Sequence, residues 1–231
     1  MSTFVLVHGA YHGAWCWELL RPELERRGQQ SVAVDLPFGD PAAGTLACAE
    51  LVAAAVEDCG DDVVLVGHSL AGLVVPVAAG LRPVRRLVHL CALLPRPPLS
   101  FDEASAGEPI FDHFTPSVPA VSNPDGSTSC PEQRAVELFY HDCPTPLARW
   151  AAARLRPQHW RVTSEATPLS VWPGVPSSYV LCVDDRAVNP GWSRRAALAV
   201  LGVEAVELAG GHSPFLSRPA ELASALVSPG A

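Results

Sequence analysis

The sequence has 231 residues, of which 48% are hydrophobic, and a formal net charge of −8. This length and composition are enough for one full-sized core and favour a single domain with an insertion over two independent domains. The acidic balance without a run of basic residues argues against nucleic-acid binding, and because all 16 basic residues are arginine, Schiff-base chemistry, a P-loop lysine and a lysine general base are excluded.

Cysteine usage and the first residues predict the compartment. The seven cysteines are an odd number, show no C-x-x-C spacing and lie mostly in apolar surroundings, as buried free thiols do. The start of the chain lacks the basic segment of a signal peptide, and no apolar stretch is long enough to cross a membrane. We therefore expect a cytoplasmic protein in a reducing environment, with no membrane partner.

Short apolar strands alternate with helical patterns in the first ninety residues. Strands are predicted at Phe4–Val7, Ser31–Asp35, Asp62–Val66 and Val84–Leu90. Helices are predicted from Pro22 to Arg27, after Thr45, which would be the N-cap, and over Leu70–Ala79, which Pro76 should bend.

The alternation stops after Pro95 and returns after residue 170. The later strands are expected at Ser178–Val183 and Val203–Leu208, and the later helices at Pro190–Leu201 and Pro219–Val227. Strand–helix alternation implies right-handed crossovers, so we expect an α/β fold with a mostly parallel sheet of about six strands and helices on both faces.

The intervening segment has a different character. Ten of the 23 prolines lie between Pro95 and Pro146, and helical patterns occur around Glu132–Tyr140 and Pro146–Leu155. The aromatic residues of this segment argue against a disordered excursion. We expect residues 96–170 to form a cap over a binding site, inserted into a core made of residues 1–95 and 171–231.

A strand-to-helix turn at Ser69 is the strongest chemical signal. An apolar, β-branched run ends at Gly67, turns at Ser69 and continues past Gly72 as a segment of small and apolar residues. This is the pattern of the nucleophile elbow, in which a strained serine is held clear of the sheet. Glycines are needed nearby because strand and helix come very close there.

Other reactive groups follow other predicted strands. These are His8-Gly9-Ala10, Asp184-Asp185 and His212, and ligands of such sheets collect at the carboxyl ends of strands. The order Ser, Asp, His along the chain is that of α/β-hydrolases. Ser69 would attack a carbonyl carbon, His212 would act as base and then acid, and an aspartate would orient the imidazole. Backbone N–H groups of Leu70 and Ala10 would bind the oxyanion.

The sequence resembles the α/β-hydrolase superfamily, in particular compact esterases related to plant methyl esterases and hydroxynitrile lyases. The matching stretches are Val5–Trp17, Val66–Gly72, Tyr179–Val188 and Gly211–Pro214, and the cap is not matched in detail. The resemblance selects Asp185 as the acid, since Arg186-Ala187-Val188 follows it. The residue pattern alone leaves Asp184 open.

Two departures from the related lyases favour ester hydrolysis. Those enzymes place a threonine where this chain has Gly9 and a lysine where it has Ser213. We therefore expect a serine hydrolase that cleaves a small or medium ester, thioester or lactone through an acyl-enzyme, with no cofactor. A same-fold tailoring enzyme and a small-molecule receptor are the alternatives. His8 and His12 have metal-like spacing, but their glycine-rich loop favours hydrogen-bonded histidines and no metal. The sequence does not determine the natural substrate or the oligomeric state.

Overall fold

A six-stranded parallel sheet forms the centre of the computed structural model, which describes residues 1–228. Its order is β2-β1-β3-β4-β7-β8, and every neighbouring pair is parallel. The strands are β1 (Thr3–Val7), β2 (Gln30–Val34), β3 (Val63–His68), β4 (Arg86–Leu90), β7 (Ser177–Cys182) and β8 (Val206–Leu208). The predicted parallel sheet of about six strands is confirmed, with each strand shifted by a few residues at most.

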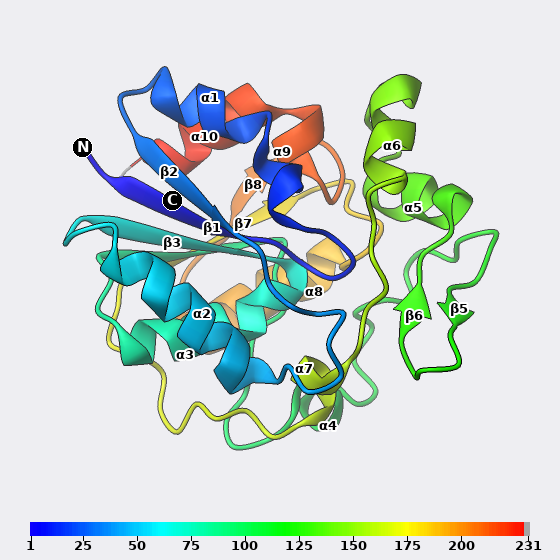
Figure 1. The fold of residues 1–231 in the computed structure, drawn as a ribbon, viewed down its shortest axis with the longest axis horizontal. Coiled ribbons are helices and arrows are strands. Elements are labelled where there is room, and N and C mark those ends of the chain that lie inside the picture. Colours follow the sequence, from blue (N-terminus) through cyan, green and yellow to red (C-terminus); the bar gives the residue numbers. More distant parts are fainter. Residues whose placement is uncertain (229–231) are drawn as a thin grey trace.

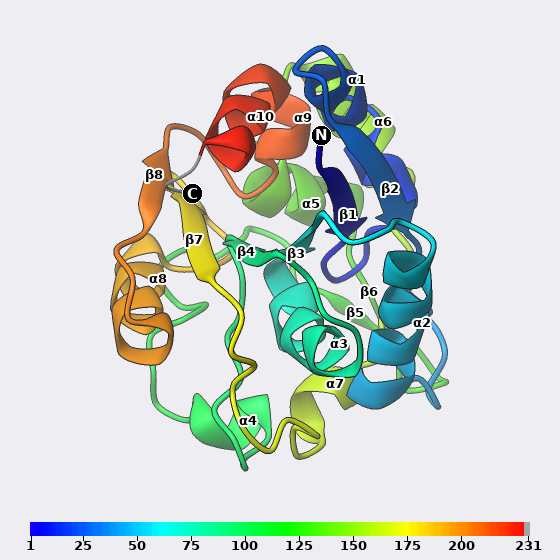
Figure 2. The same ribbon diagram turned by 90° about the vertical axis from the view of Figure 1, so that its left-hand side faces the viewer.

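Helices cover both faces of the sheet (Figures 1 and 2). One face carries α2 (Thr45–Glu57), α3 (Val75–Leu81) and α8 (Pro190–Ala196), and the other carries α1 (Leu20–Glu25), α9 (Pro214–Ser217) and α10 (Pro219–Val227). Side chains of β1 alternate between the two layers, with Val5 and Val7 in one core and Phe4 and Leu6 in the other. Because both faces are buried, the central strands are continuously apolar.

The segment between β4 and β7 departs from the alternation, as the sequence predicts. It contains α4 (Phe101–Ala104), β5 (Val121–Ser122), β6 (Thr128–Ser129), α5 (Glu132–Phe139), α6 (Thr145–Ala152) and α7 (Arg161–Ser164). Strands β5 and β6 form a separate antiparallel pair. In Figure 1 this pair lies with α5 and α6 beyond the carboxyl ends of the sheet strands. The segment therefore borders the edge where parallel strands present their ligand sites.

Two predicted helix details are wrong. The residues after Ser69 form a 3-10 helix, η2 (Ser69–Leu73), and α3 begins only at Val75, so that Pro76 lies in its first turn, where proline needs no backbone partner, and does not bend the helix. Thr45 is the first helical residue of α2 and Gly44 is the N-cap. The Glu165 carboxylate accepts the hydrogen bond of the Thr45 N–H, and a Cβ on Gly44 would lie 2.5 Å from that carboxylate.

Short helices complete the described chain. The 3-10 helix η1 (Ala14–Trp17) follows β1, and one wider turn, η3 (Ala197–Leu201), extends α8 over the rest of its predicted length. Among residues 1–228, none of the helices is both long and apolar enough to span a lipid bilayer.

Candidate active site

Ser69 lies at a strained backbone position directly after β3. Its φ is +52°, a region that side-chain-bearing residues rarely adopt. The chain is tightly packed around it: a Cβ added to Gly9 would lie 2.7 Å from the Ser69 Cβ, and one added to Gly67 would lie 2.7 Å from a methyl group of Val75. Glycine is therefore needed both within β3 itself and in the loop after the neighbouring strand β1 for the serine to project from the sheet edge.

The elbow departs by one residue from its usual G-x-S-x-G pattern. Ala71 occupies the place of the second glycine, and Gly72 follows it. The close approach occurs at Gly72, where a Cβ would lie 2.1 Å from the carbonyl oxygen of Leu93. The Leu93 N–H in turn donates to the Ser69 carbonyl oxygen at 3.0 Å. The segment after β4 thus packs against the turn that carries Ser69 and is hydrogen-bonded to it.

Asp185 and His212 form a buried pair at the ends of β7 and β8. His212 Nδ1 lies 2.8 Å from Asp185 Oδ2, and the two side chains are 2% and 3% exposed. The other carboxylate oxygen accepts the N–H groups of Ala187 and Val188 at 2.8 and 3.0 Å. A carboxylate only accepts, so Nδ1 carries the proton and Nε2 is left as a bare base.

The neighbouring aspartate points elsewhere. One oxygen of Asp184 accepts the N–H of Gly210 at 3.3 Å, and the Asp184 N–H donates to the Gly210 carbonyl at 3.0 Å. Asp184 therefore ties together the two loops that carry the pair but does not reach the imidazole. Of the two aspartates that the residue pattern left open, the structure places Asp185 against His212.

A cavity of about 510 Å³ brings the predicted site residues together. Ala10, Ser69, Leu70 and His212 all line it, while Asp185 lies behind the imidazole. Its wall is mainly apolar and includes Leu93, Val188 and, from the segment between β4 and β7, Phe101, Phe111, Phe114, Leu138, Phe139 and Trp160. Arg134 and Asp102 are the charged lining residues contributed by the same segment. The arrangement suits a largely apolar small molecule placed over the Ser69 hydroxyl.

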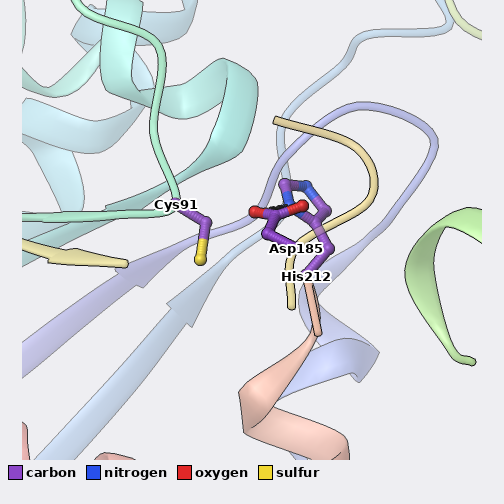
Figure 3. A group of neighbouring side chains, drawn as sticks. All are labelled: Cys91, Asp185 and His212. Atoms are coloured by element: carbon purple, nitrogen blue, oxygen red, sulfur yellow. Dashed lines mark hydrogen bonds and ion pairs between the residues drawn. The ribbon is translucent and has the colours of Figure 1, made fainter. Parts of the chain in front are cut away.

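Cys91 lies beside the Asp185–His212 pair (Figure 3). It follows β4, and its sulfur, an Asp185 oxygen and a His212 nitrogen all lie within 4.8 Å of one another. The neighbouring thiol of Cys182 and burial raise the pKa of Cys91 well above its ordinary range, so the thiol stays protonated. The Asp185 carboxylate and His212 Nδ1, which a metal would need as ligands, already bond each other. The group is therefore a hydrogen-bonded Asp–His pair with a protonated thiol beside it.

The other histidines near the site are hydrogen-bonded. His12 Nδ1 lies 2.8 Å from the Ala10 carbonyl oxygen, and burial lowers the pKa of His12 to about 3. His8 bonds the Gly9 carbonyl through Nδ1 and the Leu36 N–H through Nε2. Three of the four ring nitrogens of His8 and His12 thus bond the backbone, as expected for hydrogen-bonded loop histidines, and His12 Nε2 lies 2.8 Å from the Tyr140 hydroxyl.

His68 supports the neighbouring base. Its Nε2 lies 2.9 Å from the carbonyl oxygen of His212, and the two ring centroids are 4.6 Å apart. Burial lowers the pKa of His68 well below its ordinary range, so it remains uncharged beside His212.

The sequence left the roles of several aromatic and polar residues open. Trp160 lines the cavity, whereas Trp17 is fully buried in the core. Among the histidines of the segment between β4 and β7, His113 and His141 bond backbone carbonyls of the Asp184–Asp185 turn. Cys91 was missed as a neighbour of the acid, although it follows a strand in the same way as Ser69. Within residues 1–228, the non-glycine residues with positive φ are Tyr11, Ser69 and Cys91, and all three lie at this edge of the sheet.

Comparison with known proteins agrees with this fold. Residues 4–225 match the alpha/beta hydrolase family model. Norfluorocurarine synthase 2 from Strychnos sp is 31% identical over 97% of this chain and 93% of that protein. Methylesterase 7 from Arabidopsis thaliana is 27% identical over 98% of this chain and 95% of its own length. The crystal structure of polyneuridine aldehyde esterase superposes with a TM-score of 0.83 at 24% identity, covering 98% of both chains. The chain belongs to the alpha/beta hydrolase family and is related to the plant methylesterases.

Proposed function

We propose that the protein is a serine hydrolase that cleaves a carboxylic ester, thioester or lactone through an acyl-enzyme. The observation that carries the proposal is the buried Asp185–His212 pair at the rim of a cavity that Ser69 also lines. The Nδ1–H tautomer imposed by Asp185 leaves Nε2 free to take a proton, which is what a weakly acidic serine hydroxyl requires of its base.

The reaction follows from these positions. His212 Nε2 takes the Ser69 proton as the hydroxyl oxygen attacks the carbonyl carbon, and Asp185 stabilises the imidazolium that forms. The negative oxygen is bound by the N–H groups of Leu70 and Ala10, and loss of one such donor typically costs about 3–4 kcal/mol of transition-state stabilisation. The imidazolium then gives its proton to the leaving alcohol. Water attacks the acyl-enzyme with His212 as base again, and no cofactor takes part.

The cavity supports a medium-sized, mainly apolar substrate. We propose that residues 96–170 act as its cap, because twelve of the twenty lining residues lie between 101 and 163. The absence of lysine and the close contact at Gly9 favour hydrolysis over a lyase reaction, since a threonine at position 9 would collide with Ser69. The seven free thiols support our proposal of a reducing, cytoplasmic environment.

A same-fold tailoring reaction is the second candidate. Norfluorocurarine synthase 2 covers nearly the whole chain and is named as a synthase, so an acyl transfer, cyclisation or C–C cleavage at this site is the alternative to hydrolysis. A small-molecule receptor without catalysis is the third candidate, and it would not need the Nδ1–H tautomer that Asp185 imposes on His212.

Labelling of the nucleophile separates enzyme from receptor. A fluorophosphonate should modify the wild-type protein and Ser164→Ala, whose exposed serine lies outside the cavity, but not Ser69→Ala. A folded protein in which Ser69 stays unlabelled refutes the proposal. An ester panel in oxygen-labelled water then separates the reactions: a hydrolase places label in the acid product, whereas transfer or cyclisation gives product without it.

A further inference from the structure

Three consecutive side chains directly after α5 bond three different loops of the candidate active site. They are Tyr140, His141 and Asp142, in the segment between β4 and β7. The loops they reach are the one after β1, the Asp184–Asp185 turn after β7 and the Gly210–His212 loop after β8.

Tyr140 reaches the loop after β1 through His12. The Tyr140 hydroxyl lies 2.8 Å from His12 Nε2, and His12 Nδ1 lies 2.8 Å from the Ala10 carbonyl. The carbonyl can only accept, so Nδ1 carries the proton, and the neutral ring must accept the Tyr140 O–H at Nε2. Tyr140 and His12 are 0% and 2% exposed. This chain orients Ala10, whose N–H is the proposed oxyanion donor.

His141 reaches the turn that carries the acid. Its Nε2–H donates to the Asp184 carbonyl oxygen at 3.0 Å, and His113 of the same segment donates to the Asp185 carbonyl at 2.8 Å. Two successive peptide groups next to the carboxylate that holds His212 are therefore bonded by this segment.

Asp142 reaches the loop that carries the base. Its Oδ2 accepts the N–H of Gly211 at 2.8 Å, the residue directly before His212. A Cβ on Gly210 would lie 2.7 Å from Asp142 Oδ2, and one on Gly211 would lie 2.6 Å from His141 Nε2. The two glycines thus allow this loop to rest directly against the two side chains.

We propose that Tyr140, His141 and Asp142 form a positioning brace, which holds the oxyanion donor, acid and base in register with one another. The proposal rests on the proposed hydrolase function. The three catalytic groups come from loops far apart in the chain, and each of these loops accepts or donates a bond to one of the three residues or, after β1, to its partner His12. A misplacement of about 1 Å can cost about 100-fold in rate, so three consecutive residues that bond all three loops preserve the rate of the chemical step.

Kinetics of four variants test the brace. Asp142→Ala removes the acceptor for Gly211 N–H, and kcat should fall about 10–100-fold with KM changed less than about threefold, because none of the three brace residues lines the cavity. Asp142→Asn keeps an acceptor oxygen and should restore most of kcat. Tyr140→Phe loses only the buried hydroxyl and should lower kcat about tenfold even if Asp142→Ala folds poorly. The matched control, Glu132→Ala, changes an exposed residue at the start of α5 and should leave kcat unchanged.

A second readout needs no substrate. The proton on His212 Nδ1, shared with Asp185, should give a downfield proton NMR signal in the wild type, Asp142→Asn and Glu132→Ala. The signal should be broadened by exchange in Asp142→Ala at a temperature where circular dichroism shows the variant folded. Wild-type kcat and a wild-type signal in both Asp142→Ala and Tyr140→Phe overturn the brace, as does a raised KM at unchanged kcat. If the wild type hydrolyses no ester, the proposed function fails while the NMR signal still decides the brace.

Discussion

Replacing Asp185 with asparagine should reverse the tautomer of His212. One oxygen of Asp185 sits between the N–H groups of Ala187 and Val188, at 2.8 and 3.0 Å, and the other faces His212 Nδ1 at 2.8 Å. In Asp185→Asn the amide oxygen must take the place between the two N–H donors. The amide NH₂ then points at Nδ1, which can bond it only by giving up its proton, and the imidazole hydrogen moves to Nε2.

A proton on Nε2 removes the base that Ser69 needs. The same tautomer reversal lowers kcat by about 10⁴-fold in serine proteases, which corresponds to about 5 kcal/mol of activation free energy. We expect a loss of this size in kcat for a p-nitrophenyl ester at pH 7. Since the side chain keeps its volume and its bonds to Ala187 and Val188, the melting temperature should change little.

Asp184→Asn is the matched control. In the described structure the Asp184 side chain bonds only the Gly210 N–H, so this variant should retain kcat within about threefold. The reasoning is refuted if Asp185→Asn keeps more than about a tenth of wild-type kcat, or if Asp184→Asn is the variant that loses activity.

Two further predictions concern stability. Gly72→Ala places a Cβ 2.1 Å from the Leu93 carbonyl oxygen and should lower the free energy of unfolding by at least about 3 kcal/mol, or the melting temperature by about 6–12 °C. The control Gly80→Ala in α3 meets no atom within 4 Å and should be neutral or stabilising. Equal melting temperatures of the two variants would contradict the close approach. Burial in β4 lowers the pKa of His89 to about 3. Below pH 6.5 the unfolded chain therefore binds a proton that the folded chain does not, and the free energy of unfolding decreases as the pH is lowered. His89→Leu should therefore lose about 2 kcal/mol less than wild type between pH 7 and pH 5 in urea unfolding, and parallel curves for the two proteins would refute it.

The sheet and the candidate site residues could be predicted from sequence because parallel strands end at one edge. A reactive residue that closely follows an apolar strand lies at that edge, as Ser69 does directly after β3 and His212 does after the short loop that follows β8. The choice between Asp184 and Asp185 needed coordinates or a resemblance, because adjacent residues in a tight turn point in different directions.

The contacts of residues 140–142 could not be predicted from the sequence alone. They depend on the path of a proline-rich segment with no strand or helix period of its own over much of its length. The start of α3 was not predicted for a local reason, since a proline is compatible both with a bend inside a helix and with the first turn of one. Periodicity reports which face is buried but not which neighbour buries it.

The contacts of residues 140–142 have a consequence for attempts to change the substrate by exchanging segments between members of the family. Single substitutions of lining residues such as Phe111 or Ala120 can reshape the cavity without touching any bond to the reactive loops. Transplanting the entire stretch 96–170 from a relative is different, because the donor stretch must reproduce the three contacts of residues 140–142 or arrive with its own compatible glycine loop. Chimeras should therefore keep their activity when residues 140–142 and the Gly210–Gly211 pair come from the same parent.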